Sequence, residues 1–309
     1  MSQPKAEPQT QARARVRTVV IGHTSGGQGG GQGASTLCLV IAAALKAQGQ
    51  KVATIDCAGD QALTRALAAR ECSLAEAGLA ERPAAHRALP SGDGEAALDA
   101  LGEAVAALGR GHDFIMLDTW GAGAAITRMA YALADTLVLP FTPWDLDLAL
   151  DPSADTDLFD AGSLSSIGSI VREARRERRA RDLGEIDWIV LRNRVPARQG
   201  FRLPARTADL VSRAAMEFGY RTLDGLGDRP AHRTALATGL TIFDRDDELA
   251  PVAEPGLAAI SSALEAWTMV EALRLPLDPT ARRRAALHAE WAAARRTPLE
   301  LDPMLGPEG

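Results

Sequence analysis

The chain of 309 residues carries 34 basic and 40 acidic side chains, a formal net charge of −6, and 46% of its residues are hydrophobic. This length lies near the upper limit for one hydrophobic core, so we expect one large domain with tails. The net charge argues against nonspecific nucleic-acid binding by the whole surface, so any DNA contact must come from a local basic patch. An odd number of cysteines, two of them in apolar stretches, indicates reduced core thiols and a cytoplasmic protein.

Residues 1–16 are polar and lack the apolar segment that a signal peptide needs, so we expect a disordered N-terminal arm. No apolar run approaches the roughly 20 residues that a membrane-spanning helix requires. The main domain is expected over 17–275. An Arg-rich helix and a tail are expected to follow over 276–309.

Short apolar runs alternate with longer helical stretches along the chain, a pattern typical of an α/β fold. It predicts a doubly wound, mainly parallel sheet with helices on both faces. The expected strands are 16–22, 51–56, 113–118, 135–140 and 187–193. Helices are expected over 35–48 and 257–273, and the Pro- and Gly-rich stretch 82–95 is expected to be a surface loop. Ligands of such folds bind at the carboxyl ends of the strands.

A glycine-rich loop lies between the first expected strand and its helix, where a P-loop belongs. Its phosphate-binding residues would be Gly29, Gly30, Gly31, Gln32, Gly33, Ala34, Ser35 and Thr36. Successive backbone N–H groups and a helix N-terminus favour an anion there, and Ser35 stands where a P-loop hydroxyl would bind Mg²⁺. The alternative is a flexible glycine linker. The loop contains no lysine, although a working P-loop ends Gly-Lys-Ser/Thr.

Two aspartates, Asp56 and Asp118, end the second and third expected strands. Asp118 has the apolar-run-then-Asp form of a Walker B carboxylate, which would hold Mg²⁺ through water. The alternative is that either residue only forms a turn.

Four stretches together resemble the MipZ division-plane regulators, within the ParA and MinD type of deviant-Walker P-loop ATPases. They are 29–36, 113–130 (containing AITRMA), 188–194 (WIVLRNR) and 225–244, and the resemblance runs from about Arg17 to Asp244. It implies binding of ATP and Mg²⁺, a nucleotide-dependent homodimer, nonspecific DNA binding, ParB as a partner and inhibition of FtsZ polymerisation. A nucleoid-associated or polar location in the cytoplasm would follow.

The resemblance also assigns roles to single residues. Ser35 and Asp118 would lie on the magnesium side, Asn193 is a candidate adenine contact, and Asp56 is the remaining candidate for catalysis. A basic cluster could meet DNA phosphates, or could be an ordinary solvated face. Its members are Arg192, Arg194, Arg198, Arg202 and Arg206.

The departures from the family pattern concentrate where ATP chemistry would occur. The signature lysine aligns with Gly29, the Walker lysine with Ala34 and a second aspartate with Ala58. Trp120 replaces a proline and Gly123 an acidic residue. At roughly 1.5 to 3 kcal/mol for each charge-assisted hydrogen bond, two lost lysines would weaken nucleotide binding by about two to four orders of magnitude.

Two functions therefore remain open. One is a nucleotide-switched regulator of division-site placement for which we do not expect efficient ATP hydrolysis. The other is a catalytically silent pseudo-ATPase that serves as a dimerisation or partner-binding module. A different P-loop enzyme, such as a kinase, would need the missing lysine. The sequence leaves open whether an arginine, Arg192 for example, replaces the missing charge.

Overall fold

The computed structural model describes most of the expected main domain. The described residues are 15–23, 31–79, 83–90, 92–119, 122–142, 162–196, 205–244 and 257–281, with Arg283 and Ala286. None of the described helices has the length and hydrophobicity needed to cross a membrane. The predicted arm 1–16 and the predicted C-terminal segment 276–309 lie largely outside these residues, so the domain boundaries stay predictions.

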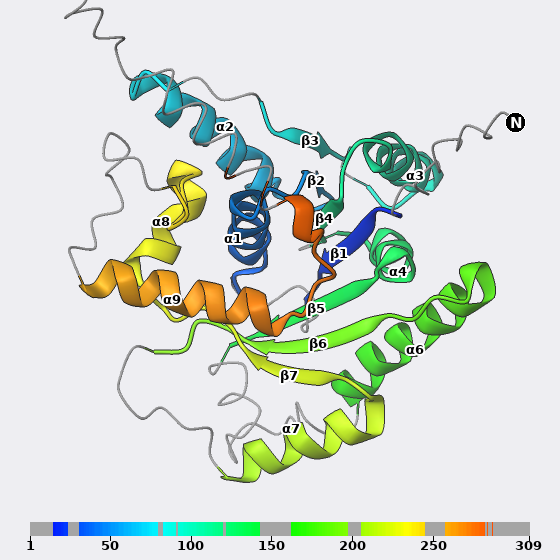
Figure 1. Ribbon diagram of the computed structural model, residues 1–309. Helices are drawn as coiled ribbons and strands as arrows, with labels where there is room; N and C mark the ends of the chain where they lie inside the picture. The colour runs from blue at the N-terminus through cyan, green and yellow to red at the C-terminus, as the bar shows by residue number, and fades with distance from the viewer. Residues whose placement is uncertain are drawn as a thin grey trace, which may run out of the picture.

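A seven-stranded sheet forms the centre of the described structure, in the order β3-β2-β4-β1-β5-β6-β7. Every pairing in it is parallel, which confirms the predicted fold class (Figure 1). The strands are β1 (Arg17–Ile21), β2 (Val52–Asp56), β3 (Ala85–Ala88), β4 (Phe114–Asp118), β5 (Thr136–Phe141), β6 (Asp187–Arg192) and β7 (Arg221–Asp224).

Helices cover both faces of the sheet (Figure 1). One core lies under α1 (Ala34–Ala47), α2 (Ala62–Glu76), α8 (Pro230–Thr238) and α9 (Leu257–Ala272). The other lies under α3 (Glu95–Gly109), α4 (Ala124–Leu133), α6 (Gly162–Asp182) and α7 (Ala205–Phe218). β1, β2, β4 and β5 are buried almost throughout because both of their faces are covered, as their continuous apolar runs predicted.

The prediction that 82–95 is only a surface loop was wrong, because β3 lies within it, and β7 was not predicted. Both are edge strands. β3 is half-buried to exposed, and β7 alternates between half-buried and exposed residues. Neither therefore carries the apolar run from which the central strands were recognised. Their pairing with β2 and β6 decides their conformation.

Arginines of α6 fix this helix to the ends of its neighbours. Arg178 is 1% exposed, and its guanidinium donates to the carbonyls of Leu133 and Ala134, at the end of α4, at 2.9 and 2.8 Å. It also pairs with Asp135 and Asp182. Cations are stabilised at a helix C-terminus, where carbonyls lack helical partners. A polar helix can therefore pack closely against the sheet.

Candidate functional site

The glycine-rich loop begins at the carboxyl end of β1, between β4 and β5. Residues 24–30 lie outside the described residues, so the predicted contacts of Gly29 and Gly30 stay untested. From Gly31 the loop leads directly into α1, and Gly31 and Gly33 have φ angles of +54° and +82°. These left-handed conformations favour glycine. No described side chain caps α1, and its first turn has no acidic residue, so the helix start is suited to an anion.

The two residues that follow β6 hold this loop in place. The Nδ2 of Asn193 donates to the carbonyl of Gln32 at 2.8 Å, and the Nη1 of Arg194 donates to the carbonyl of Gly31 at 2.7 Å. Asn193 Oδ1 also accepts from the N–H of Leu226 at 3.0 Å. We call Asn193 and Arg194 the β6 brace. It fixes two successive carbonyls of the loop.

Gly33 is required for this contact as well as for its backbone angle. A Cβ placed on Gly33 would lie 2.6 Å from the Nδ2 of Asn193. Gln32 and Asn193 are 0% and 2% exposed, so neither has room to move aside. The glycine at position 33 is therefore explained by close packing against Asn193.

Asp118 lies next to the start of the loop and is completely buried. It is paired in register with Ile21, the last residue of β1. Ser35 is also buried, at the first turn of α1. A hydroxyl and a carboxylate are oxygen ligands of the kind Mg²⁺ takes, so the two residues fit the predicted metal, although their roles stay predictions.

Asp56 lies beside Asp118 in the sheet, and its carboxylate hydrogen-bonds to the backbone and to Thr64. Its Oδ2 accepts from both the N–H and the hydroxyl of Thr64, at 2.8 and 2.7 Å, and its Oδ1 accepts from the N–H of Ala58 at 2.9 Å. The carboxylate thus caps the start of α2. A catalytic role for Asp56 stays a prediction.

The two aspartates affect the nearby thiols. Burial, followed by the charges of Asp118 and Asp56, raises the pKa of Cys38 and of Cys57. Both cysteines are buried and free, which confirms the prediction of reduced core thiols for these two residues.

A cavity of about 250 Å³ opens beside the loop. It is lined by Gly31, Gly33 and Thr36, by the β6 brace, by residues 226–229 and by α8. Arg233 makes two contacts of 2.8 Å with Asp228, and this hydrogen bonding lowers the pKa of Asp228. Burial opposes ionisation of Glu265, yet hydrogen bonds from its neighbours, including Arg229, lower its pKa. Charged side chains therefore line part of this cavity, next to a backbone anion site.

The family model described as ATPase MipZ matches residues 17–277, which is most of the chain. The chain belongs to the MipZ family. Apo McdA from Cyanothece is similar in structure, with a TM-score of 0.52 at 19% identity over 84% of this chain and 100% of that chain. An ATP complex of a McdA variant from Cyanothece has a TM-score of 0.51 at 18% identity, over 84% and 96% of the two chains. At these identities the likeness shows the fold alone. A search of curated proteins finds no match.

The basic cluster predicted from the MipZ resemblance is only partly described. Arg192 pairs with Asp224 at 2.6 Å, and Arg194 belongs to the β6 brace. Arg198 and Arg202 lie outside the described residues, as does the side chain of Arg206 on α7. The structure therefore describes only two of the five arginine side chains, and DNA contact stays a prediction.

One departure from the MipZ pattern has a structural explanation. Gly123 replaces an acidic residue at the N-cap of α4, and a Cβ there would collide with the carboxylate of Asp93. Asp93 Oδ1 accepts from the N–H groups of Ala125 and Ile126 at 2.8 and 3.0 Å. The acidic group at the start of α4 thus comes from a different part of the chain, which the sequence pattern alone could not reveal.

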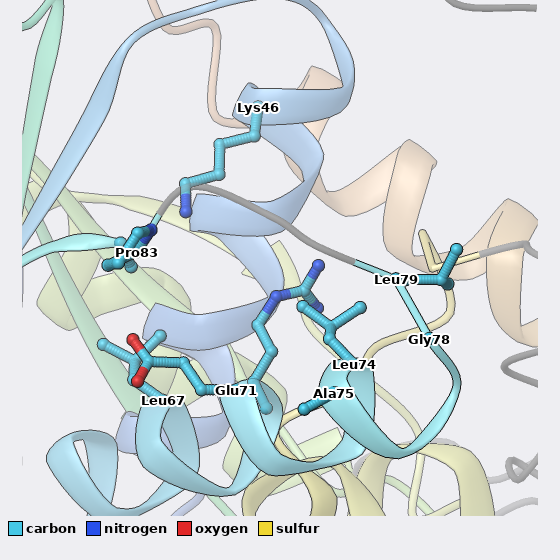
Figure 2. Close-up of a pocket in the computed structure, with 10 residues that line it drawn as sticks. Lys46, Leu67, Glu71, Leu74, Ala75, Gly78, Leu79 and Pro83 are labelled. Atoms are coloured by element: carbon cyan, nitrogen blue, oxygen red, sulfur yellow. The ribbon is translucent and has the colours of Figure 1, made fainter.

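A larger cavity, of about 430 Å³, contains no residue of the phosphate loop. In Figure 2, Lys46 approaches it from α1, and Leu67, Glu71 and Leu74 line it from α2.

Residues 226–229 and Arg233, which line the smaller cavity, were not singled out from the sequence. The signal was their position within 225–244, one of the four resembling stretches.

Proposed function

We propose that this chain is a nucleotide-switched regulator of division-site placement that binds ATP with Mg²⁺ at the loop 29–36. The observation that supports this most strongly is the β6 brace, which holds two loop carbonyls beside the uncapped start of α1. Backbone N–H groups of the loop and the positive end of the helix then bind the phosphates.

Ser35 and Asp118 would hold Mg²⁺, which neutralises phosphate charge when it is bound. The nucleoside would enter the cavity beside Asn193. The Asn193 amide uses one N–H and one lone pair in the brace, so one N–H and one lone pair are left to contact adenine. The proposed adenine contact and the structural role are therefore compatible.

Membership of the MipZ family supports the remaining proposed roles. The nucleotide-bound chain would form a homodimer, meet DNA through the basic cluster that contains Arg192, and act on FtsZ with ParB as a partner. We expect hydrolysis to be slow because the loop lacks lysine and Asp56 is engaged with α2.

Calorimetric titration with ATP and Mg²⁺ tests the nucleotide site. We expect binding in the wild type and a large loss of affinity in Asp118→Ala, whereas Asp99→Ala, an exposed position on α3, should bind normally. No binding at millimolar ATP would refute the site. Sedimentation of FtsZ polymers then tests the biological role, since ATP-bound protein should reduce the pelleted fraction and the Asp118→Ala variant should not.

The pseudo-ATPase is the second candidate, favoured by Ala34 at the Walker lysine position. It would bind nucleotide or a partner without turnover. Phosphate release that is measurable in the wild type and abolished in Asp118→Ala would reject it.

A further inference from the structure

Arg194 lies where the phosphate loop lacks its own cation. Its Nη1 donates to the Gly31 carbonyl at 2.7 Å, and its N–H donates to the Leu226 carbonyl at 2.7 Å. Its φ of +55° is a left-handed conformation that non-glycine residues rarely adopt. The backbone at this position therefore directs a long basic side chain onto the loop, at the mouth of the cavity.

The charges around the cavity single out Arg194. Arg229 pairs with Glu265 at 2.9 Å, and Arg233 pairs with Asp228 through two contacts of 2.8 Å. The Nε of Arg194 lies 4.0 Å from the same Asp228, at the limit of an ion pair. Three arginines thus face two carboxylates. Arg194 carries the surplus positive charge, and its side chain is 41% exposed.

The chain has three lysines, and neither of the two described ones belongs to this site. Lys5 lies outside the described residues, Lys46 lines the other cavity, and Lys51 immediately precedes β2, at the opposite end of that strand from Asp56. Among the described residues, a cationic side chain for a polyphosphate at this loop would therefore be an arginine.

We propose that Arg194 is the cation of the nucleotide site and contacts a phosphate of the bound nucleotide. This inference rests on the proposed function. A guanidinium carries five N–H donors in a planar fork that suits phosphate, so the donor used on Gly31 leaves the others available. Arg192 is a weaker candidate for this contact, because its guanidinium is paired with Asp224.

The experiment measures the dissociation constant of Mg²⁺–ATP over a series of salt concentrations, without DNA. Arg194→Gln and Arg194→Met should weaken binding roughly ten- to hundredfold and flatten its salt dependence. Arg194→Lys should recover most of the affinity. The matched control is Arg179→Gln, which removes the same charge from an exposed position on α6 that pairs with Glu185. It should bind as the wild type does.

Uncharged adenosine serves as the second probe. The neutral variants should bind adenosine with the affinity of the wild type, because only the phosphate contact is lost. Equal losses for adenosine and ATP, or an unchanged salt dependence, would show that Arg194 only shapes the loop and would overturn the inference. ATP affinity that is unchanged in the neutral variants would overturn it too, while leaving the proposed function standing. Failure of the wild type to bind ATP would overturn both.

Discussion

Replacing Asn193 by alanine tests whether the β6 brace stabilises the protein. The substitution leaves the Gln32 carbonyl and the Leu226 N–H without their partner, and both residues are buried, at 0% and 2% exposed. Each buried, unsatisfied group costs about 1 to 3 kcal/mol, so the unfolding free energy should fall by about 2 to 6 kcal/mol. That is a large share of the 5 to 15 kcal/mol typical of a folded domain.

Urea denaturation without nucleotide measures this loss, and the m-value should stay unchanged. Asn193→Asp is the matched variant. It retains an acceptor for Leu226, but its carboxylate oxygen would face the Gln32 carbonyl and should be at least as destabilising near neutral pH. If Asn193 served only to contact adenine, Asn193→Ala would have the wild-type unfolding free energy without nucleotide. It would lose only the additional stability that bound Mg²⁺–ATP gives. A loss below about 0.5 kcal/mol without nucleotide would thus refute the structural role.

Three further predictions concern stability. Arg178→Met should lower the unfolding free energy by about 3 to 5 kcal/mol in urea because it leaves buried acceptors unpaired, whereas Arg179→Met, at an exposed position, should change it by less than about 0.5 kcal/mol. Gly78→Ala should lower the unfolding free energy by about 1 to 2 kcal/mol because of the positive φ alone, since the added Cβ would have nothing within 4 Å. Gly33→Ala should lower it by more in the same assay, because its Cβ would also collide with the β6 brace. Burial lowers the pKa of His86 in the folded protein, so as pH falls this imidazole is protonated in the unfolded chain before it is protonated in the folded one. Stability should therefore decline below about pH 6.5, and a pH series of melts should show a shallower decline in His86→Gln.

The fold was predictable from the sequence wherever burial alone decides the structure. β1, β2, β4, β5 and β6 each lie within a residue or two of their predicted ranges, because a strand covered on both faces must be continuously apolar. β3 and β7 lie at the edges, where pairing with one neighbour replaces burial. Their short sequences carry no comparable signal.

The candidate site was predictable only in its local part. The loop, Ser35 and Asp118 could be proposed from the sequence because their positions follow from the strand or helix next to them in the chain. The β6 brace joins residues more than 160 positions apart, and Asp93 caps a helix that begins 31 residues later. Which arginine reaches the loop depends on the left-handed turn at Arg194, which apolar periodicity does not encode. The sequence therefore left open whether an arginine, Arg192 for example, reaches the loop, and the structure places Arg194 on it.

The two aspartates at the carboxyl ends of β2 and β4 have different roles. Asp56 and Asp118 are register partners on adjacent strands, so both carboxylates face the same end of the sheet. Asp56 accepts three hydrogen bonds, two from Thr64 in the first turn of α2 and one from the N–H of Ala58, and moving it toward a ligand would expose those donors. Asp118 lies beside the last residue of β1, from which the loop starts. A metal at the loop would therefore be held from the β4 side, while the β2 side keeps α2 in place. Ala58 supplies no second carboxylate there, so slow hydrolysis is the behaviour that this arrangement favours.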